Sequence, residues 1–263
     1  MKLIEGVKLE FRTSYDNQSV MINNVEYLDN SYTPNDNWIS LNEVHENILF
    51  DNASIQKCFN KIIIDDIPLS IKKIMVELNI SESNSRDEVF RKFSDNPKFT
   101  LNFESKMIKY LRTFCKTNDD FKLYKMLVLY PNRKTTAFID FDNGIKYLGL
   151  HYDSCTTFEI ETAHNSKNSL NLGKEDRELY FVNLSLVQIK ELILKKNALE
   201  IVTLKNITPL FFKYYPDYPV LKLKIKPFQY YIAPTDNCIH EGTTLRKKEI
   251  DISITYLGYF TKI

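Results

Sequence analysis

The chain has 263 residues, with 35 Lys and Arg against 34 Asp and Glu, and a formal net charge of +1. This balance argues against a strongly basic nucleic-acid-binding protein, and no apolar run approaches the ~20 residues that a membrane-spanning helix needs. Charges at Lys2, Glu5, Lys8 and Glu10 interrupt the stretch where a signal peptide would be hydrophobic. We therefore expect a cytoplasmic protein that binds neither nucleic acid nor a membrane; its oligomeric state stays open.

The cysteines agree with this compartment. Cys58, Cys115, Cys155 and Cys238 lie far apart and form no CxxC pair. Such spacing favours free thiols in a reducing environment over a disulfide framework.

In chain order, residues 1–12 and about 19–28 alternate apolar and polar side chains, which predicts two early strands. From about 40 to 117 the apolar spacing becomes i, i+3, i+4, and this block contains no glycine. We therefore predict a helical block, with helices in the stretches Leu41–Phe59, Pro68–Leu78, Arg86–Phe93 and Phe103–Phe114.

From about residue 121 the hydrophobic period drops to two, which predicts strands. Leu186–Lys196 has helical spacing instead, and Thr208–Tyr215 is a second short helix candidate. The segment from about 163 to 178 is interpreted as a long loop that closes over a site. The candidate strands are Phe121–Tyr130, Thr136–Asp142, Lys146–His151, Thr156–Thr162, Leu179–Leu184, Val220–Lys226, Tyr230–Ala233 and Ile250–Phe260.

These elements predict an α+β protein. Eight short strands with one helical insertion, after a helical block, are typical of a double-sheet β-barrel or jelly roll flanked by helices. We place the N-terminal strands and supporting helices in residues 1–120 and the barrel in residues 121–263, within one integrated domain.

Glycine and histidine point to the second half of the chain. The sequence has only 6 glycines, and five of them, together with three of the four histidines, follow residue 140. Gly149 precedes His151 and Asp153, whose i, i+2 spacing puts both side chains on one face of a strand. His240 lies in a distant segment. Two imidazoles and a carboxylate form the facial triad that holds Fe(II) while leaving positions open for a co-substrate and O2.

These residues resemble the Fe(II)/2-oxoglutarate-dependent oxygenases. The resemblance rests on Gly-Leu-His-Tyr-Asp-Ser at 149–154 and on Ala-Pro-Thr at 233–235 followed by Ile-His-Glu-Gly at 239–242, and it covers about residues 121–263. It implies a cupin-like double-stranded β-helix in which His151, Asp153 and His240 are the iron ligands. The turn at 226–229 is similar to the Pro-Gly turn of cupin-type barrels, with Phe228 in place of glycine.

The same resemblance implies a cation for the distal carboxylate of 2-oxoglutarate. Members usually carry an arginine on the final strand, often with a Ser or Thr two residues away. Here that strand offers the hydroxyls of Ser253 and Thr255 but no cation, so Arg246, in the preceding loop, is the first candidate. The other basic candidates are Lys247, Lys248, Lys134 and Arg177.

Three further features have alternative interpretations. His164 follows the HxD pair and is an alternative third ligand, although its polar surroundings favour an exposed loop. His45, in the helical block, is interpreted as a surface or partner-facing residue. The aromatic cluster at 211–218 fits either a ligand-stacking surface or a core segment.

The sequence therefore predicts an Fe(II)/2-oxoglutarate-dependent dioxygenase that hydroxylates a C–H bond of a small molecule, such as an amino acid or a biosynthetic intermediate. One alternative is a cupin-like iron dioxygenase that does not use 2-oxoglutarate, and another is a metal-free jelly-roll module that binds a ligand. No phosphate-binding glycine loop, GxSxG elbow or HExxH helix is present, which argues against a nucleotide enzyme, a serine hydrolase or a zincin.

Overall fold

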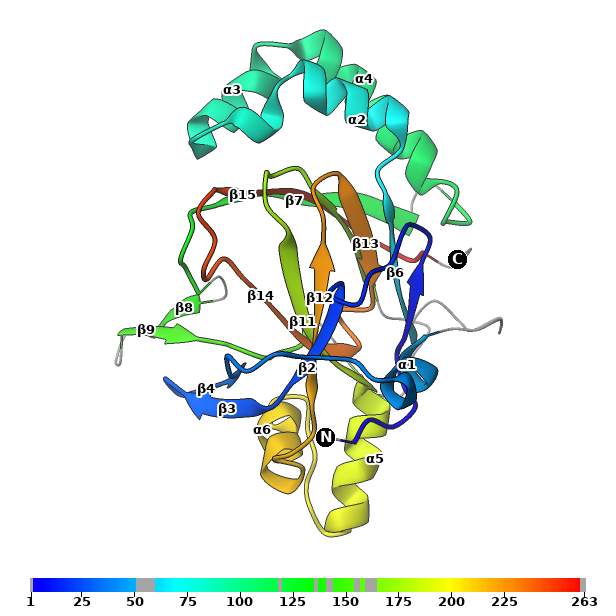
Figure 1. The fold of residues 1–263 in the computed structure, drawn as a ribbon, viewed down its shortest axis with the longest axis vertical. Coiled ribbons are helices and arrows are strands. Elements are labelled where there is room, and N and C mark those ends of the chain that lie inside the picture. The colour runs from blue at the N-terminus through cyan, green and yellow to red at the C-terminus, as the bar shows by residue number, and fades with distance from the viewer. Residues whose placement is uncertain are drawn as a thin grey trace.

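Two β-sheets form the centre of the computed structural model, and helices pack on the outer face of each (Figure 1). The structure describes residues 2–50, 60–117, 120–134, 137–140, 144–153, 157–158 and 165–260. Buried side chains from both sheets, among them Ile62, Ile64, Phe181 and Leu223, form one hydrophobic cluster, so the sheets pack face to face. The fold is a mixed α+β fold with a sheet-rich core.

The first sheet has six strands, and all neighbours are antiparallel except β1 and β6. In order across the sheet they are β1 (Lys8–Phe11), β6 (Lys61–Asp66), β13 (Gln229–Ala233), β10 (Ser166–Asn171), β15 (Asp251–Gly258) and β7 (Phe121–Leu129).

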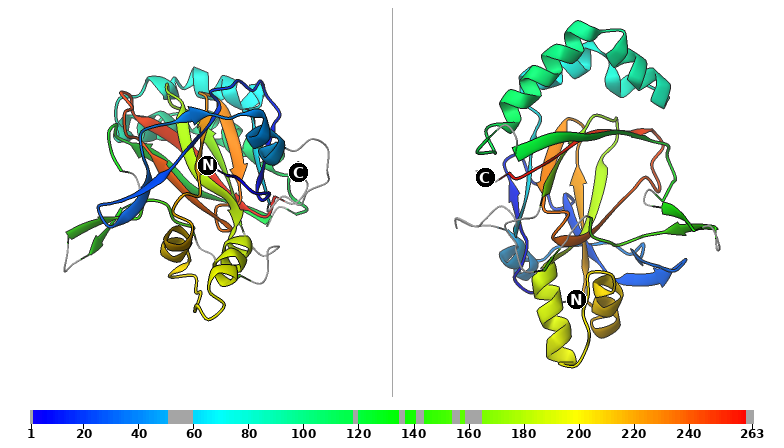
Figure 2. Two further views of the ribbon diagram at one scale, coloured as in Figure 1. Left: turned by 60° about the horizontal axis from the view of Figure 1, so that its bottom comes forward. Right: turned by 180° about the vertical axis from the view of Figure 1, so that it is seen from behind.

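The second sheet has five antiparallel strands, and two hairpins accompany it. The hairpins project from the same side of the molecule (Figures 1 and 2). In order, the strands are β14 (Cys238–Thr243), β11 (Arg177–Ser185), β12 (Val220–Ile225), β2 (Val20–Asn23) and β5 (Ile39–Ser40); the hairpins are β3 (Val25–Leu28) with β4 (Ser31–Pro34), and β8 (Ala137–Asp140) with β9 (Gly144–Tyr147).

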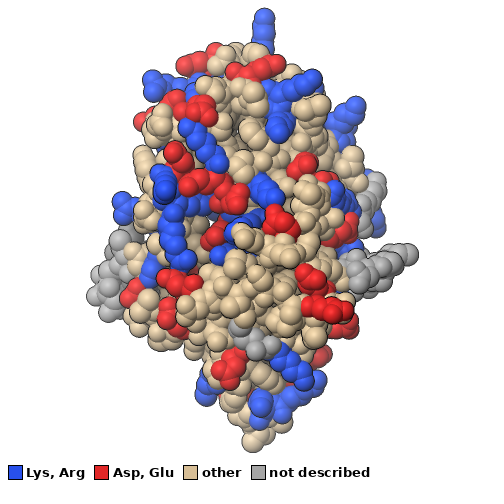
Figure 3. All heavy atoms as spheres, viewed as in Figure 1, with Lys and Arg blue, Asp and Glu red and all other residues tan. Residues whose placement is uncertain are grey.

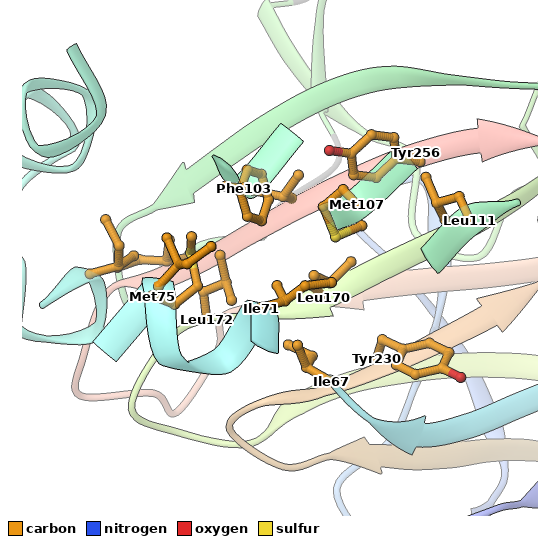
Figure 4. Packing of buried hydrophobic residues seen from close by; sticks show 14 of the residues in the cluster. Ile67, Ile71, Met75, Phe103, Met107, Leu111, Leu170, Leu172, Tyr230 and Tyr256 are labelled. Atoms are coloured by element: carbon orange, nitrogen blue, oxygen red, sulfur yellow. The ribbon is translucent and has the colours of Figure 1, made fainter. Parts of the chain in front are cut away.

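One group of helices covers the six-stranded sheet (Figures 1 and 2). It comprises α2 (Leu69–Glu77), the 3₁₀ turn η2 (Ile80–Glu82), α3 (Arg86–Ser94) and α4 (Pro97–Leu111). Figure 4 shows Ile71, Met107 and Leu111 from these helices facing Leu170 and Tyr256 of the sheet, all in one buried cluster. Full burial of each such side chain stabilises the fold by about 1.5–3 kcal/mol.

The remaining helices are α1 (Glu43–Leu49), α5 (Leu186–Lys196) and α6 (Ile207–Tyr214). Ser185 begins α5 with a capping box, in which its hydroxyl accepts a hydrogen bond from the Gln188 backbone N–H and the Gln188 side chain accepts one from Ser185. Ile189 and Phe211 pack against Val182 on the outer face of the five-stranded sheet. None of the helices in the described ranges is long and apolar enough to cross a membrane.

Basic and acidic side chains are mixed over the face shown in Figure 3, without an extended area of one sign. This distribution agrees with the near-zero net charge of the sequence.

Most predicted elements form where their periodicity places them, including the strands β7, β11, β12, β13 and β15 and the helices α2 to α6. Strand β6 is missing from the predictions: it lies between the predicted helices Leu41–Phe59 and Pro68–Leu78, within the block that we predict to be helical, and Ile62, Ile63 and Ile64 are all fully buried in it. Ile63 packs under the helices and Ile62 and Ile64 pack between the sheets. A strand covered on both faces shows no alternation.

The predicted lid loop is also wrong in part, since residues 166–171 form β10, between β13 and β15. Its sequence is polar, yet Asn168 is fully buried. Polar side chains in a strand that lines a polar interior give no hydrophobic alternation. The predicted strand Thr156–Thr162 and the end of Leu41–Phe59 lie largely outside the described residues. The boundary at residue 120 stays a prediction; strands from both sides of it are hydrogen-bonded within the same two sheets.

Candidate metal centre

The fold brings His151, Asp153 and His240 together. One potential ligand atom from each residue lies within 4.8 Å of the other two, the one such group of three His, Cys, Asp or Glu in the described ranges. Two backbone hydrogen bonds join the histidines: His151 N donates to His240 O at 2.9 Å and His240 N donates to His151 O at 2.6 Å. Asp153 N donates to Thr235 O at 3.1 Å. Backbone pairing therefore positions the three side chains.

Hydrogen bonds fix which nitrogen each imidazole presents to the centre. His151 Nδ1 donates to Gly149 O at 2.7 Å, and His240 Nδ1 donates to Cys238 O at 3.2 Å. A carbonyl only accepts, so Nδ1 carries a proton in each ring and Nε2 is the nitrogen left to face the centre. His240 Nε2 lies 3.4 Å from Asp153 Oδ2, and Lys167 contacts the same carboxylate oxygen. Two imidazole Nε2 atoms and one carboxylate are a donor set that fits a divalent metal.

The charge states also suit metal binding. Burial lowers the pKa of His151 to about 4, and the neighbouring His240 lowers it further. Burial by itself would raise the pKa of Asp153, but its contacts with His240 and Lys167 hold that pKa below its ordinary range. His151 is therefore neutral and Asp153 ionised at neutral pH, the forms in which these residues bind metals.

Gly149 shapes the turn that leads into the first two residues. Its φ is +58°, and a Cβ atom at this position would lie 2.4 Å from the Tyr32 carbonyl oxygen, which already accepts a hydrogen bond from Leu150 N. The left-handed conformation and the close backbone contact both require glycine.

Gly149→Ala is expected to lower the free energy of unfolding by at least about 1–2 kcal/mol, the cost of an L-residue in this conformation, and to displace His151. Gly242→Ala is the matched control, because its Cβ would lie 4.0 Å from its nearest neighbour, Glu178 O, an ordinary contact. Denaturant titrations of both variants measure the difference. Equal stability of the two would contradict this account of Gly149.

The three residues line a cavity of about 200 Å³ between the sheets. Its charged lining is balanced: three cations (Lys125, Lys167 and Arg177) face three acids (Asp153, Glu178 and Asp251). A divalent metal together with a dianion would keep this balance. The apolar part of the lining is formed by Leu127, Leu129, Leu179, Ile225 and Tyr231.

Arg177 is the arginine that the structure brings into this cavity. Its Nε lies 3.1 Å from Asp251 Oδ2, and its Nη1 donates to Ser169 Oγ at 2.9 Å. Thr255 lines the same cavity and shares a hydrogen bond with Ser169. Ser253 lies between Asp251 and Thr255 on the same face of β15, fully buried, and its Oγ has no hydrogen-bond partner among the described residues.

Arg246, the first candidate from the sequence, lies elsewhere. It is in the turn after β14, its side chain is mostly exposed, and it forms an ion pair with Asp36. It does not line the cavity of the three-residue cluster. The sequence singled it out because it is near His240 in the chain, but the turn carries it away from the sheet interior.

Two lysines of the cavity were missed in the sequence. Lys167 contacts the carboxylate of Asp153, and Lys125 is half-buried beside it. Lys125 had a usable signal, because it alternates with Leu127 and Leu129 on a predicted strand. Lys167 has no such signal, because its segment is polar and shows no hydrophobic alternation.

Other residues singled out in the sequence have structural roles. His45 is buried and forms a capping box with Asn42 at the start of α1, so the surface interpretation is wrong. Phe211 and Phe212 of the aromatic cluster are core residues. Phe228 adopts a φ of 61°, the left-handed conformation that the Pro-Gly turn gives to glycine. His164 lies outside the described residues.

Fold and site together define a candidate 2-His-1-carboxylate metal centre on a sheet-rich α+β scaffold. No family model and no curated protein matches the sequence. Among solved structures, the chain is similar to the Kdo hydroxylase KdoO, described as a non-heme Fe(II) alphaketoglutarate-dependent dioxygenase. The complex with alphaketoglutarate and Fe(III) matches at a TM-score of 0.39 and 9% identity, and the complex with cobalt(II) at 0.36 and 10%, each covering 75% of this chain and 79% of that chain. At this level of similarity the activity of KdoO does not transfer to this chain, and the function has to be argued from its own residues.

Proposed function

We propose that this protein is an Fe(II)/2-oxoglutarate-dependent dioxygenase that hydroxylates a C–H bond of a small molecule. The observation that carries the proposal is the cluster of His151, Asp153 and His240, in which two imidazoles and a carboxylate converge in the lining of a cavity. This donor set is typical of non-haem Fe(II) oxygenases because it leaves coordination positions open. When bound, iron and 2-oxoglutarate supply the activation of O2 that no side chain provides.

We propose that Arg177 holds the distal carboxylate of 2-oxoglutarate. Lys167 touches Asp153, and Ser169, two residues further along β10, touches Arg177. Two residues of a strand span about 7 Å, so a five-carbon dicarboxylate matches the distance between the cluster and the guanidinium. The hydroxyls of Ser253 and Thr255 would donate hydrogen bonds to the same distal carboxylate. The Oγ atom of Ser253 is available for this because it has no hydrogen-bond partner among the described residues.

The cavity residues would also position the small-molecule substrate. Leu127, Leu129 and Tyr231 exclude water from the site, which strengthens every charge interaction inside it. The ammonium of Lys167 neutralises Asp153 before a metal binds, and a metal ion would compete with it for Oδ2. The modest cavity volume of about 200 Å³ favours a small substrate such as an amino acid or a biosynthetic intermediate.

The double-stranded β-helix is part of the same proposal. The order β7, β15, β10, β13 in one sheet and β14, β11, β12 in the other supports it, because strands consecutive in the chain from β10 to β15 alternate between the two sheets except β11 and β12, which are neighbours in the same sheet. The His151 segment, which bridges to His240, would complete the eight strands as the neighbour of β14. The two candidate ligand segments then lie side by side at one edge of the smaller sheet.

Succinate formation tests the activity directly. Metal-free protein supplied with Fe(II), 2-oxoglutarate and O2 is expected to form succinate faster than the same mixture without protein, and a chelator is expected to abolish that difference. Metal analysis is expected to give one ion per chain. With Mn(II) in place of Fe(II), 2-oxoglutarate is expected to raise the melting temperature of the loaded protein.

Each part of this experiment distinguishes the alternatives. Metal binding without any effect of 2-oxoglutarate would favour the cupin-like dioxygenase. The reason to consider that alternative is the absence of an arginine on the final strand. Arg177, which pairs with Asp251 of that strand, supplies an arginine from a neighbouring sheet and so weakens this reason. Absence of stoichiometric metal binding would overturn the proposal and favour a metal-free binding module.

A further inference from the structure

A second cavity, of about 340 Å³, lies on the opposite side of β14 from the candidate metal centre. Side chains alternate along a strand, so His240 and Glu241 point to opposite faces of the sheet. His240 lines the first cavity and Glu241 lines the second, while Thr243 borders both. The hairpin β3–β4, which projects from the molecule in Figures 1 and 2, contributes Glu26 and Leu28 to one wall.

Glu241 is the residue in this cavity that calls for a ligand. Its exposure is 6%, and its Oε2 is buried without a hydrogen-bond partner among the described residues. A carboxylate taken out of water without a partner is destabilising, and buried polar groups of folded proteins are nearly always hydrogen-bonded. Glu241 lines an open cavity, so a ligand that enters it can reach this carboxylate.

The two cations that line the cavity are already engaged with other acids. Lys134 Nζ lies 2.5 Å from Asp29 Oδ2, and Arg246 is paired with Asp36. Within the described residues Glu241 forms no ion pair; the charge of Lys134 acts to lower its pKa, but burial outweighs this and raises the pKa of Glu241 to about 7. Three acids, Glu26, Asp36 and Glu241, line the cavity against two cations, Lys134 and Arg246, so a positively charged ligand would balance the lining and favour the ionised form of Glu241.

The wall beside Glu241 is aromatic and apolar. The rings of Trp38 and Tyr180 stack with centroids 5.2 Å apart and an interplanar angle of 26°. Lys222 Nζ lies 4.4 Å from the Trp38 ring centroid, which shows that an ammonium is compatible with this wall. Leu28 and Leu245 line the cavity although they are 49% and 40% exposed.

From this combination we propose that the second cavity binds a small organic cation, with an alkylammonium group on the Glu241 carboxylate and an apolar body against Trp38, Tyr180 and Leu245. A buried carboxylate supplies the charge-assisted hydrogen bond, and the aromatic and leucine side chains supply the apolar contact. The site is separate from the candidate metal centre and does not depend on the proposed dioxygenase activity.

Pentylamine and pentan-1-ol form a matched pair of probes, because they have nearly the same size and only the amine is charged at neutral pH. Calorimetric titration of the full chain is expected to show pentylamine binding at least tenfold more tightly than pentanol. Glu241→Gln is expected to lose that preference, and Glu191→Gln, an exposed change on α5, is expected to keep it. Lysine N-methylamide with an acetylated α-amine, tested in parallel, distinguishes a free amine from a lysine side chain presented by a peptide.

Glu241→Gln is expected to remain folded without any ligand, with a melting temperature close to that of the unchanged protein. Glutamine has nearly the size of glutamate, and the Oε2 atom that it replaces has no hydrogen-bond partner among the described residues. Equal affinity for amine and alcohol in the unchanged protein would overturn the proposal. So would full retention of amine binding in Glu241→Gln. Mn(II) titrations of the same samples are expected to be unaffected by pentylamine.

Discussion

Asp153→Ala is expected to weaken Mn(II) or Fe(II) binding by more than about 100-fold and to abolish succinate formation. Loss of a residue that only supports a metal ligand already costs about 10- to 100-fold in metal affinity, and loss of a ligand itself should cost more. Asp153 is the one anionic member of the cluster, so its removal takes away the charge that attracts the metal. Isothermal titration with Mn(II) measures affinity independently of turnover.

The control for this variant is Glu191→Gln, which also removes one negative charge but on the exposed side of α5. Lys167 loses its partner in Asp153→Ala, and a circular dichroism spectrum and a melting curve show whether the variant is folded. His151→Ala is expected to behave like Asp153→Ala. If either folded variant binds metal and forms succinate as the unchanged protein does, these residues are not the metal ligands.

Arg177→Lys is expected to raise the KM for 2-oxoglutarate by about 10- to 100-fold, with metal affinity unchanged. A charged hydrogen bond contributes about 1.5–3 kcal/mol, and lysine presents a single ammonium where arginine presents a planar pair of donors. Lysine keeps a positive charge next to Asp251, whose side chain is 3% exposed. Arg177→Leu would leave Lys247 as the remaining ion-pair partner of Asp251, and we expect it to destabilise the fold.

Arg246→Ala separates the structural interpretation from the sequence-based one. Its ion pair with Asp36 is on the surface, and such pairs contribute about 0–1 kcal/mol, so we expect neither the KM for 2-oxoglutarate nor the stability to change much. A large increase in KM for Arg246→Ala with none for Arg177→Lys would reverse the assignment. Initial rates of succinate formation over a range of 2-oxoglutarate concentrations measure both.

The residues of the candidate cluster can be predicted from the sequence alone. His151 and Asp153 are two residues apart, so their proximity follows from local geometry. The chain holds only 4 histidines, which leaves few possible partners for that pair. Helix α5 can be predicted from the sequence in the same way, because Ile189 and Ile193 repeat at helical spacing and Ser185 with Gln188 forms its N-terminal cap.

Strands β6 and β10 show why other parts were missed. Periodicity reports a strand only when one of its faces is apolar and the other polar. Ile62 to Ile64 are buried on both faces of β6, and β10 presents Lys167 and Ser169 to a polar cavity. The strands that pair with β6 and with β10 come from segments more than fifty residues away in the chain.

The sequence by itself determined the histidines and the carboxylate that form the candidate centre, and most of the helices and strands around them, because these features depend on spacing within a few residues. Only the tertiary structure decided that Arg177 rather than Arg246 faces the centre, and that Glu241 stands unpartnered in a second cavity behind His240. Which cation meets which acid depends on how distant strands pair and which way each turn points, and neither is encoded in local spacing.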